Sequence, residues 1–392
     1  MSAPAESFPV PAQARVPAAT TGSTSASGAA GPTEPSTPAA PARPARQYSL
    51  DVLRVLAICG VVSIHTIGLV VSNRDLRGTT QWWVATAIDL GASWTVPLFV
   101  MLSGALVLSP RAHAAGPAAF YRKRFARILP ALVVWNLVYL IVARVLMRGE
   151  DLTRNGVIKL LIDGKIFTAM YFLWLIAGLY LVAPVIAAFL SQGGERRARV
   201  LAAVALSFTL VSFATVGVSV LIGVPRPIHL GALTHWWPYV GYFVAGWALR
   251  SVRLSRRAVL VASTVAVVLL AEGVWQWGVS PAHRTLQALM PISYLGTSIA
   301  IATICIFLVG ITLGARLAPG PRASTWLVRL SEASFGVFLV HLLILEALRT
   351  FIPAVYAADS LPVIVGAYLV VLVSSFAVSI GASKIPYVRA VF

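Results

Sequence analysis

The residues with the clearest chemical potential lie in one apolar stretch, residues 49–72. His65 follows Arg54 by eleven residues, and at 100° per residue eleven helical steps make three turns plus about 20°. The two side chains therefore share one helix face, about 16 Å apart along the axis. Asp51 lies about 40° from His65 on the other side. One face thus carries an acid, a guanidinium and an imidazole, and an imidazole can serve as general base or as nucleophile.

Each of these residues also has a simpler interpretation. A single histidine in a helix is more often a hydrogen-bonded core residue than a catalyst, and Arg54 could extend to a membrane surface. Ionisable side chains within an apolar span are costly, however. Their alignment on one face favours a functional stripe that faces the interior of a helix bundle.

The composition identifies the elements that must hold this stripe. Of 392 residues, 58% are hydrophobic and 11% are charged, whereas soluble domains carry about 25% charged residues. Apolar runs long enough to cross a bilayer recur along the chain. We predict an all-α, polytopic membrane protein, a bundle of about ten transmembrane helices. The predicted spans are 49–72, 82–108, 126–147, 167–190, 199–222, 236–250, 258–278, 292–316, 327–349 and 361–383.

Positive charge is unevenly divided between alternate loops. The net charge of +18 would suggest nucleic acid in a soluble protein, but here the basic residues cluster between apolar spans, so no nucleic-acid partner is predicted. With a cytoplasmic N-terminus, 20 Lys and Arg residues fall on the inner side and 10 on the outer side. The positive-inside rule therefore places both termini in the cytoplasm.

The first 47 residues differ from the rest. They hold 9 of the 24 prolines and 13 alanines, with few large apolar residues. Such a segment buries too little surface to offset its ordering entropy. We predict a disordered cytoplasmic tail at 1–47 and a transmembrane domain at 48–392.

Five short motifs follow one another along the predicted membrane domain. They are LDVLRVLAI with His65, VPLFVMLSG (96–104), FYRKRFARILP (120–130), FLWLIAGLYLVAPVI (172–186) and SFGVFLVHLLIL (334–345). In this order they resemble the acyltransferase 3 family of membrane acyltransferases, and the resemblance covers nearly all of 48–385. The family's third motif is a basic loop leading to a proline. One departure is Phe338, where the family usually has Tyr, which removes any hydroxyl from that position.

The resemblance implies transfer of an acetyl or other short acyl group from acyl-CoA to a hydroxyl of a carbohydrate-type acceptor. It implies that His65 is essential, as general base or as the nucleophile that carries the acyl group. Arg54, nearer the cytoplasm, would hold a donor phosphate or stabilise charge on the thioester oxygen. Asp51 would orient Arg54.

Further residues fit the donor or the reaction centre less specifically. Arg124 and Arg127 would bind CoA phosphates, although inner segments are basic in any case. Ser103 could polarise the donor carbonyl, but a Ser-Gly step more often serves close helix packing. His341 could line the same interior as His65 or make a structural hydrogen bond.

Two functional classes remain open. A transporter or flippase for a polar or lipid-linked solute would also need buried charges around a cavity. Asp89, Glu272 and Glu346 lie in the outer parts of their spans and could contact a polar acceptor or one another. Cys59 and Cys305 are expected as core residues, and no metal site is expected. We expect a multi-pass protein of the inner (plasma) membrane that contacts the lipid bilayer.

Overall fold

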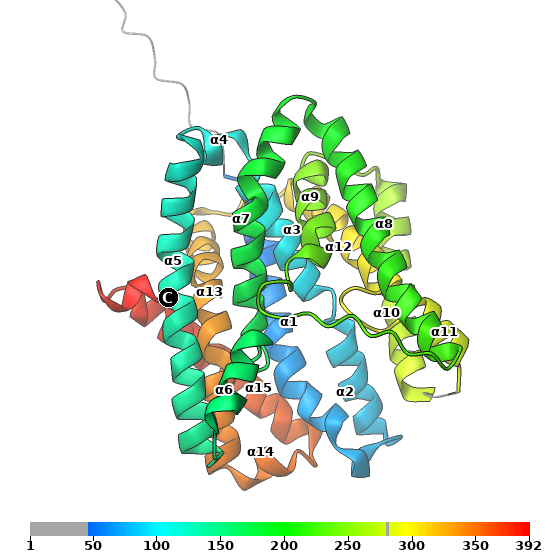
Figure 1. The fold of residues 1–392 in the computed structure, drawn as a ribbon, viewed down its shortest axis with the longest axis vertical. Coiled ribbons are helices and arrows are strands. Elements are labelled where there is room, and N and C mark those ends of the chain that lie inside the picture. The colour runs from blue at the N-terminus through cyan, green and yellow to red at the C-terminus, as the bar shows by residue number, and fades with distance from the viewer. Residues whose placement is uncertain (1–45, 280–281) are drawn as a thin grey trace, which may run out of the picture. The chain divides into compact units, whose positions relative to one another are not determined.

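The computed structural model describes residues 46–279 and 282–392, and every regular element there is helical (Figure 1). The segments long and apolar enough to cross a membrane are α1 (Tyr48–Ser72), α2 (Thr80–Gly91) continued by α3 (Thr95–Val107), α5 (Gly116–Val138) continued by the π-helical η2 (Tyr139–Met147), α7 (Tyr171–Ser191), α8 (Gly194–Leu221), α10 (Arg256–Val279), α12 (Thr297–Gly314), α13 (Pro321–Phe351) and α15 (Leu361–Ala382). The shorter elements are η1 (Arg74–Leu76), α4 (Pro110–His113), α6 (Arg154–Ile162), η3 (Trp237–Tyr239), α9 (Val240–Leu249), α11 (Arg284–Leu289), α14 (Pro353–Ala357) and η4 (Val388–Ala390).

The predicted all-α membrane bundle is confirmed. Among the described residues, nine helical segments meet the length and hydropathy needed to span a bilayer, and each matches one predicted span. The predicted tail, 1–47, lies outside the described residues except for its last two positions.

One difference concerns the basic stretch 120–130. The resemblance predicted a loop there, but it is helical, because α5 begins at Gly116 with a proline in its first turn, where proline is well tolerated. The basic side chains of this stretch therefore project from a rigid helix.

The sixth predicted span, 236–250, differs most from expectation. Its helix, α9, has only 10 residues and so reaches about 15 Å, half the hydrocarbon thickness. The hydroxyl of Thr209, in the middle of α8, donates to the carbonyl of Pro238 at 3.1 Å. Ser251, beyond the end of α9, donates to Glu195 in the first turn of α8 at 2.6 Å. α9 therefore runs antiparallel to α8 along the N-terminal half of α8 alone.

The irregular segment 222–236, which precedes η3 and α9, accounts for the remainder of this crossing. It is tied to the end of α6, since the amide of Ala232 donates to the carbonyl of Ile162 at 2.7 Å. Every residue from 241 to 248 is buried. A short buried core helix has the same apolar composition as a lipid-facing one, which is why hydropathy predicted a full span here.

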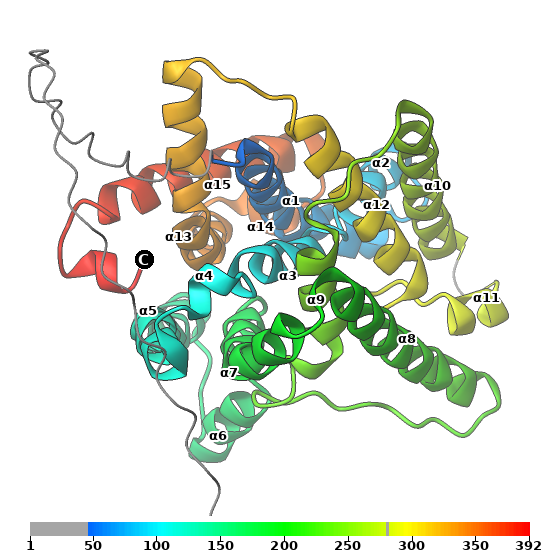
Figure 2. The same ribbon diagram turned by 90° about the horizontal axis from the view of Figure 1, so that it is seen from above.

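Seen from above, α1, α3, α9 and α13 lie centrally, with α5, α8 and α10 outside them (Figure 2). Glycines set the closest central contact, between α3 and α9. A Cβ on Gly104 would lie 1.7 Å from the carbonyl oxygen of Phe243, and one on Gly246 would lie 1.8 Å from that of Met101. Small residues allow such backbone approach between membrane helices. The packing role that we favoured for the Ser103-Gly104 step therefore applies at least to Gly104.

We predict that Gly246→Leu destabilises the bundle by about 3 kcal/mol or more, because its side chain has no space against α3. Thermal unfolding of the purified protein in detergent measures this. Gly366→Leu is the matched control, since nothing lies within 4 Å of a Cβ at that helical glycine. Equal melting temperatures for the two variants would contradict the close packing of α3 against α9.

Candidate functional site

The site is built on two helices, α1 and α13, that contact each other at two levels. Near the end where α1 begins, here named the inner end, the Arg54 guanidinium donates to the Ser331 hydroxyl at 3.2 Å. Farther along, the rings of His65 and His341 lie with centroids 5.3 Å apart. Arg54 and His65 are eleven residues apart, and Ser331 and His341 are ten apart. The helices therefore run parallel and nearly in register, as equal rises per residue require.

The two imidazoles have different surroundings. His341 is fully buried, and its Nδ1 lies 2.7 Å from the carbonyl of Phe338 and 3.1 Å from that of Val337. Because carbonyls only accept, Nδ1 carries the proton, and Nε2 of the neutral ring is left as an acceptor. Within the described part of the chain this Nε2 has no hydrogen-bond partner. His65 retains some accessible surface, whereas His341 has none.

The inner end of this helix pair is held by a charged network. Arg46 makes a bidentate contact with Asp51 at 2.8 and 3.0 Å, and the hydrogen-bonded carboxylate raises the pKa of Arg46. Ser331 donates to Asp51 at 2.6 Å and accepts from Arg54. Asp51 thus reaches Arg54 through the Ser331 hydroxyl and makes its direct ion pair with Arg46, which the sequence interpretation had left in the tail.

The predicted donor-binding arginines lie close to this network. The guanidinium of Arg127 lies 5.3 Å from the ring of Phe335 on α13, and that of Arg124 lies 5.6 Å from the ring of Tyr180 on α7. Arg54 is within electrostatic range of both Tyr180 and Arg127. Three cations from two helices therefore lie near one another at one end of the bundle, and two of them, Arg124 and Arg127, lie over aromatic rings, which favour guanidinium groups.

Ser103 does not join this group by any hydrogen bond among the described residues. It is half-buried on α3, next to the glycine that packs on α9. The structure brings together Asp51, Arg54, Arg124, Arg127, His65 and His341, the first four at the inner end and the histidines farther along.

Two positions of the site were missed by the sequence interpretation. Ser331 precedes His341 by ten residues, close to the eleven that separate Arg54 from His65. This near match in spacing could have identified Ser331. Tyr139 gave no local signal. Its hydroxyl donates to the carbonyl of Leu339 at 2.7 Å and accepts from the amide of Leu343 at 3.1 Å. It thereby fastens the start of η2 to the turn of α13 that carries His341.

The three outer acids do not contact one another. Glu272 accepts from Gln276 and from Ser298, and Glu346 accepts from arginines. Asp89 has no hydrogen bond or ion pair among the described residues. Of the two alternatives that the sequence left open for these acids, contact with one another is not seen among the described residues.

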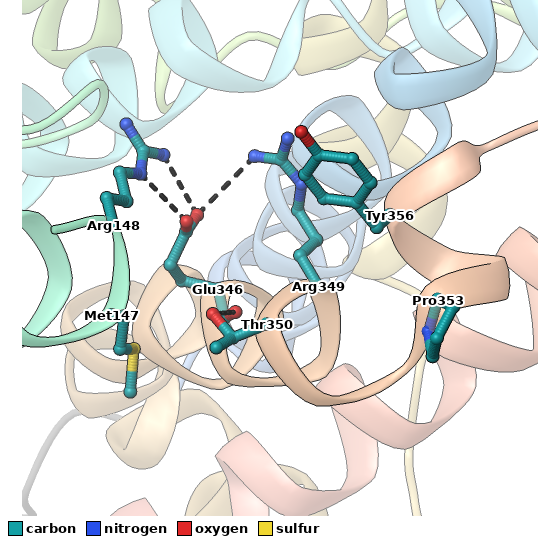
Figure 3. A pocket seen from close by; sticks show the side chains of 7 residues that line it. All are labelled: Met147, Arg148, Glu346, Arg349, Thr350, Pro353 and Tyr356. Carbon is teal, nitrogen blue, oxygen red and sulfur yellow. Dashed lines mark hydrogen bonds and ion pairs between the residues drawn. The ribbon is translucent and has the colours of Figure 1, made fainter.

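A cavity of about 660 Å³ lies around Glu346, lined by Met147, Arg148, Glu346, Arg349, Thr350, Pro353 and Tyr356 (Figure 3). Arg148 binds the carboxylate at 2.7 and 2.9 Å, and Arg349 approaches it at 3.4 Å. The hydrogen-bonded Glu346 raises the pKa of Arg148. Glu346 follows His341 by five residues and so lies about 140° around α13 from it. This cavity therefore lies on another face of α13 than the histidine pair, and its ion pairs fasten η2 to α13.

We predict that Glu346→Gln lowers the free energy of unfolding by about 2 kcal/mol, because two arginines lose a buried charged acceptor. Thermal denaturation in detergent measures the change. Glu332→Gln is the control, since the Glu332 side chain is 66% exposed and its ion pair with Arg46 is long, at 3.7 Å. A melting temperature unchanged in both variants would show that the Glu346 ion pairs contribute nothing.

No group of three or more His, Cys, Asp or Glu residues in the described ranges could hold a metal ion. Comparison with protein-family models identifies the family. Residues 47–382 match the model of the acyltransferase 3 family, described as an acyltransferase domain. No curated protein and no solved structure matches the chain.

Proposed function

The chain belongs to the acyltransferase 3 family and is a membrane acyltransferase, and from this premise we propose that it moves an acetyl or other short acyl group from acyl-CoA to a hydroxyl of a carbohydrate-type acceptor. The observation that carries the proposal is the pair of imidazoles 5.3 Å apart, with Arg54 on one of the same two helices and Arg124 and Arg127 near it on α5. Its cellular site would be the inner (plasma) membrane.

The histidine pair supports general-base catalysis. With its proton on Nδ1, His341 offers Nε2 as acceptor for an N–H of His65. That contact would fix the tautomer of His65 and leave its second nitrogen with a free lone pair, the arrangement that a third group gives to a catalytic histidine. His65 is then the catalytic base, and His341 is a positioning residue.

The reaction follows from this arrangement. His65 takes the proton of the acceptor hydroxyl as its oxygen attacks the thioester carbonyl carbon. The C–S bond breaks, an ester forms, and the CoA thiolate takes the proton back from the His65 imidazolium. Atoms and charge balance, and no further reactant is needed.

The arginine cluster supports an acyl-CoA donor. CoA carries several phosphates, and guanidinium groups bind phosphate bidentately. Without an anion, Arg54, Arg124 and Arg127 would repel one another, with Asp51 as the nearby compensating charge. A long flexible arm joins the thioester of acyl-CoA to its phosphates. Phosphates held at Arg54 would therefore leave the thioester free to reach His65, about 16 Å farther along α1.

We predict that His65→Ala lowers acyl transfer by about a thousandfold, the range typical of a lost general base. The measurement is release of CoA thiol from acetyl-CoA by purified protein in lipid nanodiscs, with melting temperature as the folding control. Turnover that survives in His65→Ala would leave His65 structural. A transporter or flippase would cleave no thioester in the wild type either.

The role of His341 predicts a difference between two substitutions. His341→Asn keeps an N–H near Nδ1 but has no acceptor at the Nε2 position, so kcat falls about a hundredfold with KM unchanged. His341→Gln places an amide oxygen near Nε2 and retains more activity. The reverse order, or equal losses in KM alone, would exclude positioning through Nε2.

We predict that Arg124→Gln and Arg127→Gln each raise the KM for acetyl-CoA about tenfold with little change in kcat, because each removes a phosphate contact. The dependence of KM on salt should weaken as well. Arg122→Gln is the control, since Arg122 lies exposed on the same helix and, unlike Arg124 and Arg127, has no aromatic ring contact among the described residues. An equal rise of KM in this variant would indicate only a general effect of basic charge.

A further inference from the structure

Asp89 is a carboxylate that the proposed reaction does not yet use. It lies on α2 within a membrane-spanning segment, half-buried. No partner among the described residues neutralises it. A carboxylate in this position is costly unless it has a function or a ligand.

Its position relative to His65 is fixed by two glycines of α1. A Cβ on Gly60 would meet the side chain of Thr95 at 2.5 Å, and one on Gly68 would lie 3.7 Å from both carboxylate oxygens of Asp89. α2 and α3 thus run antiparallel to α1, and His65, between the two glycines, lies level with the break between α2 and α3.

Gly68, which has no side chain, lets the Asp89 carboxylate come close to the backbone of α1. It follows His65 by three residues, about 4.5 Å along α1 and about 60° around it. Side chains of a helix lean toward its N-terminus, so the His65 ring leans away from Gly68. The carboxylate therefore faces α1 one turn beyond the imidazole, on the side away from Arg54.

Tyr294 lies in the same region, within electrostatic range of Asp89, and its carbonyl accepts a hydrogen bond from the hydroxyl of Tyr242 at 2.9 Å. A carboxylate without a protein partner can accept two O–H hydrogen bonds, which suits a ligand with neighbouring hydroxyls.

We propose that Asp89 is the acceptor-binding residue, which takes hydrogen bonds from hydroxyls adjacent to the one that is acylated and so places the reacting hydroxyl at His65. This inference rests on the proposed acyltransfer. It assigns the two substrates to opposite sides of His65, with the donor toward Arg54 and a polyhydroxylated acceptor toward Asp89.

The test compares two alcohols as acceptors in nanodiscs with radiolabelled acetyl-CoA. Sorbitol offers neighbouring hydroxyls, and propan-1-ol offers one hydroxyl only. Acylated alcohol and free acetate are measured together, and their ratio reports how each alcohol competes with water. In Asp89→Asn the ratio for sorbitol should fall about tenfold, while the ratio for propan-1-ol and the rate of thioester hydrolysis stay as in the wild type.

A second variant acts on the same place without removing the charge. Gly68→Ala puts a methyl group 3.7 Å from the carboxylate oxygens, an ordinary contact that the fold accommodates. The methyl group covers part of the carboxylate, so this variant should also lower the sorbitol ratio. Asp75→Asn, at an exposed acid of η1, should change nothing.

The outcomes separate the two proposals. An unchanged sorbitol ratio in Asp89→Asn, or equal losses of hydrolysis and of both alcohol ratios, would overturn the role of Asp89 and leave the acyltransferase intact. Absence of thioester cleavage in the wild type would overturn the proposed donor, and this inference with it.

Discussion

The parallel register of α1 and α13 is the constraint on which the site depends. In a bilayer, a charged side chain must find its partner inside the protein. At the inner end, Ser331 meets this need by joining the Asp51 carboxylate and the Arg54 guanidinium. Once these groups are paired, the rise of a helix leaves no freedom about where the next turns meet. Ten or eleven residues later the helices bring His341 and His65 together. The contacts among Asp51, Ser331 and Arg54 thus help to set how His65 and His341 meet.

The tight contact of α3 with α9 supplies the second constraint. Because α9 is short and buried, it does not span the bilayer and has little contact with lipid. Its position therefore depends on close backbone packing against its neighbours. Gly104 and Gly246 provide this. Holding α3 in place also holds the break between α2 and α3 at the level of His65 along α1. A contact remote from the imidazoles therefore helps to fix the elements around them.

Much of this arrangement could be predicted from local sequence. Hydropathy identifies the long spans, because lipid selects for apolar length. Helical periodicity places Arg54 and His65 on one face, because both belong to one element. Hydropathy cannot distinguish α9 from a full span, since a protein interior and a lipid tail select the same residues. Three contacts join separate elements: the pairing of Asp51 with Arg46, the bridge through Ser331, and the approach of Asp89 to Gly68. Periodicity within one helix carries no information about them.

Tyr139 shows how one hydroxyl limits what the sequence can become. Its hydroxyl donates to the carbonyl of Leu339 and accepts from the amide of Leu343. A phenylalanine there would have nearly the same shape but would lose both hydrogen bonds, in buried surroundings where no water replaces them. Tyr139 and Leu339 are 200 residues apart in sequence, yet the identity of one is constrained by the turn that the other shares with His341.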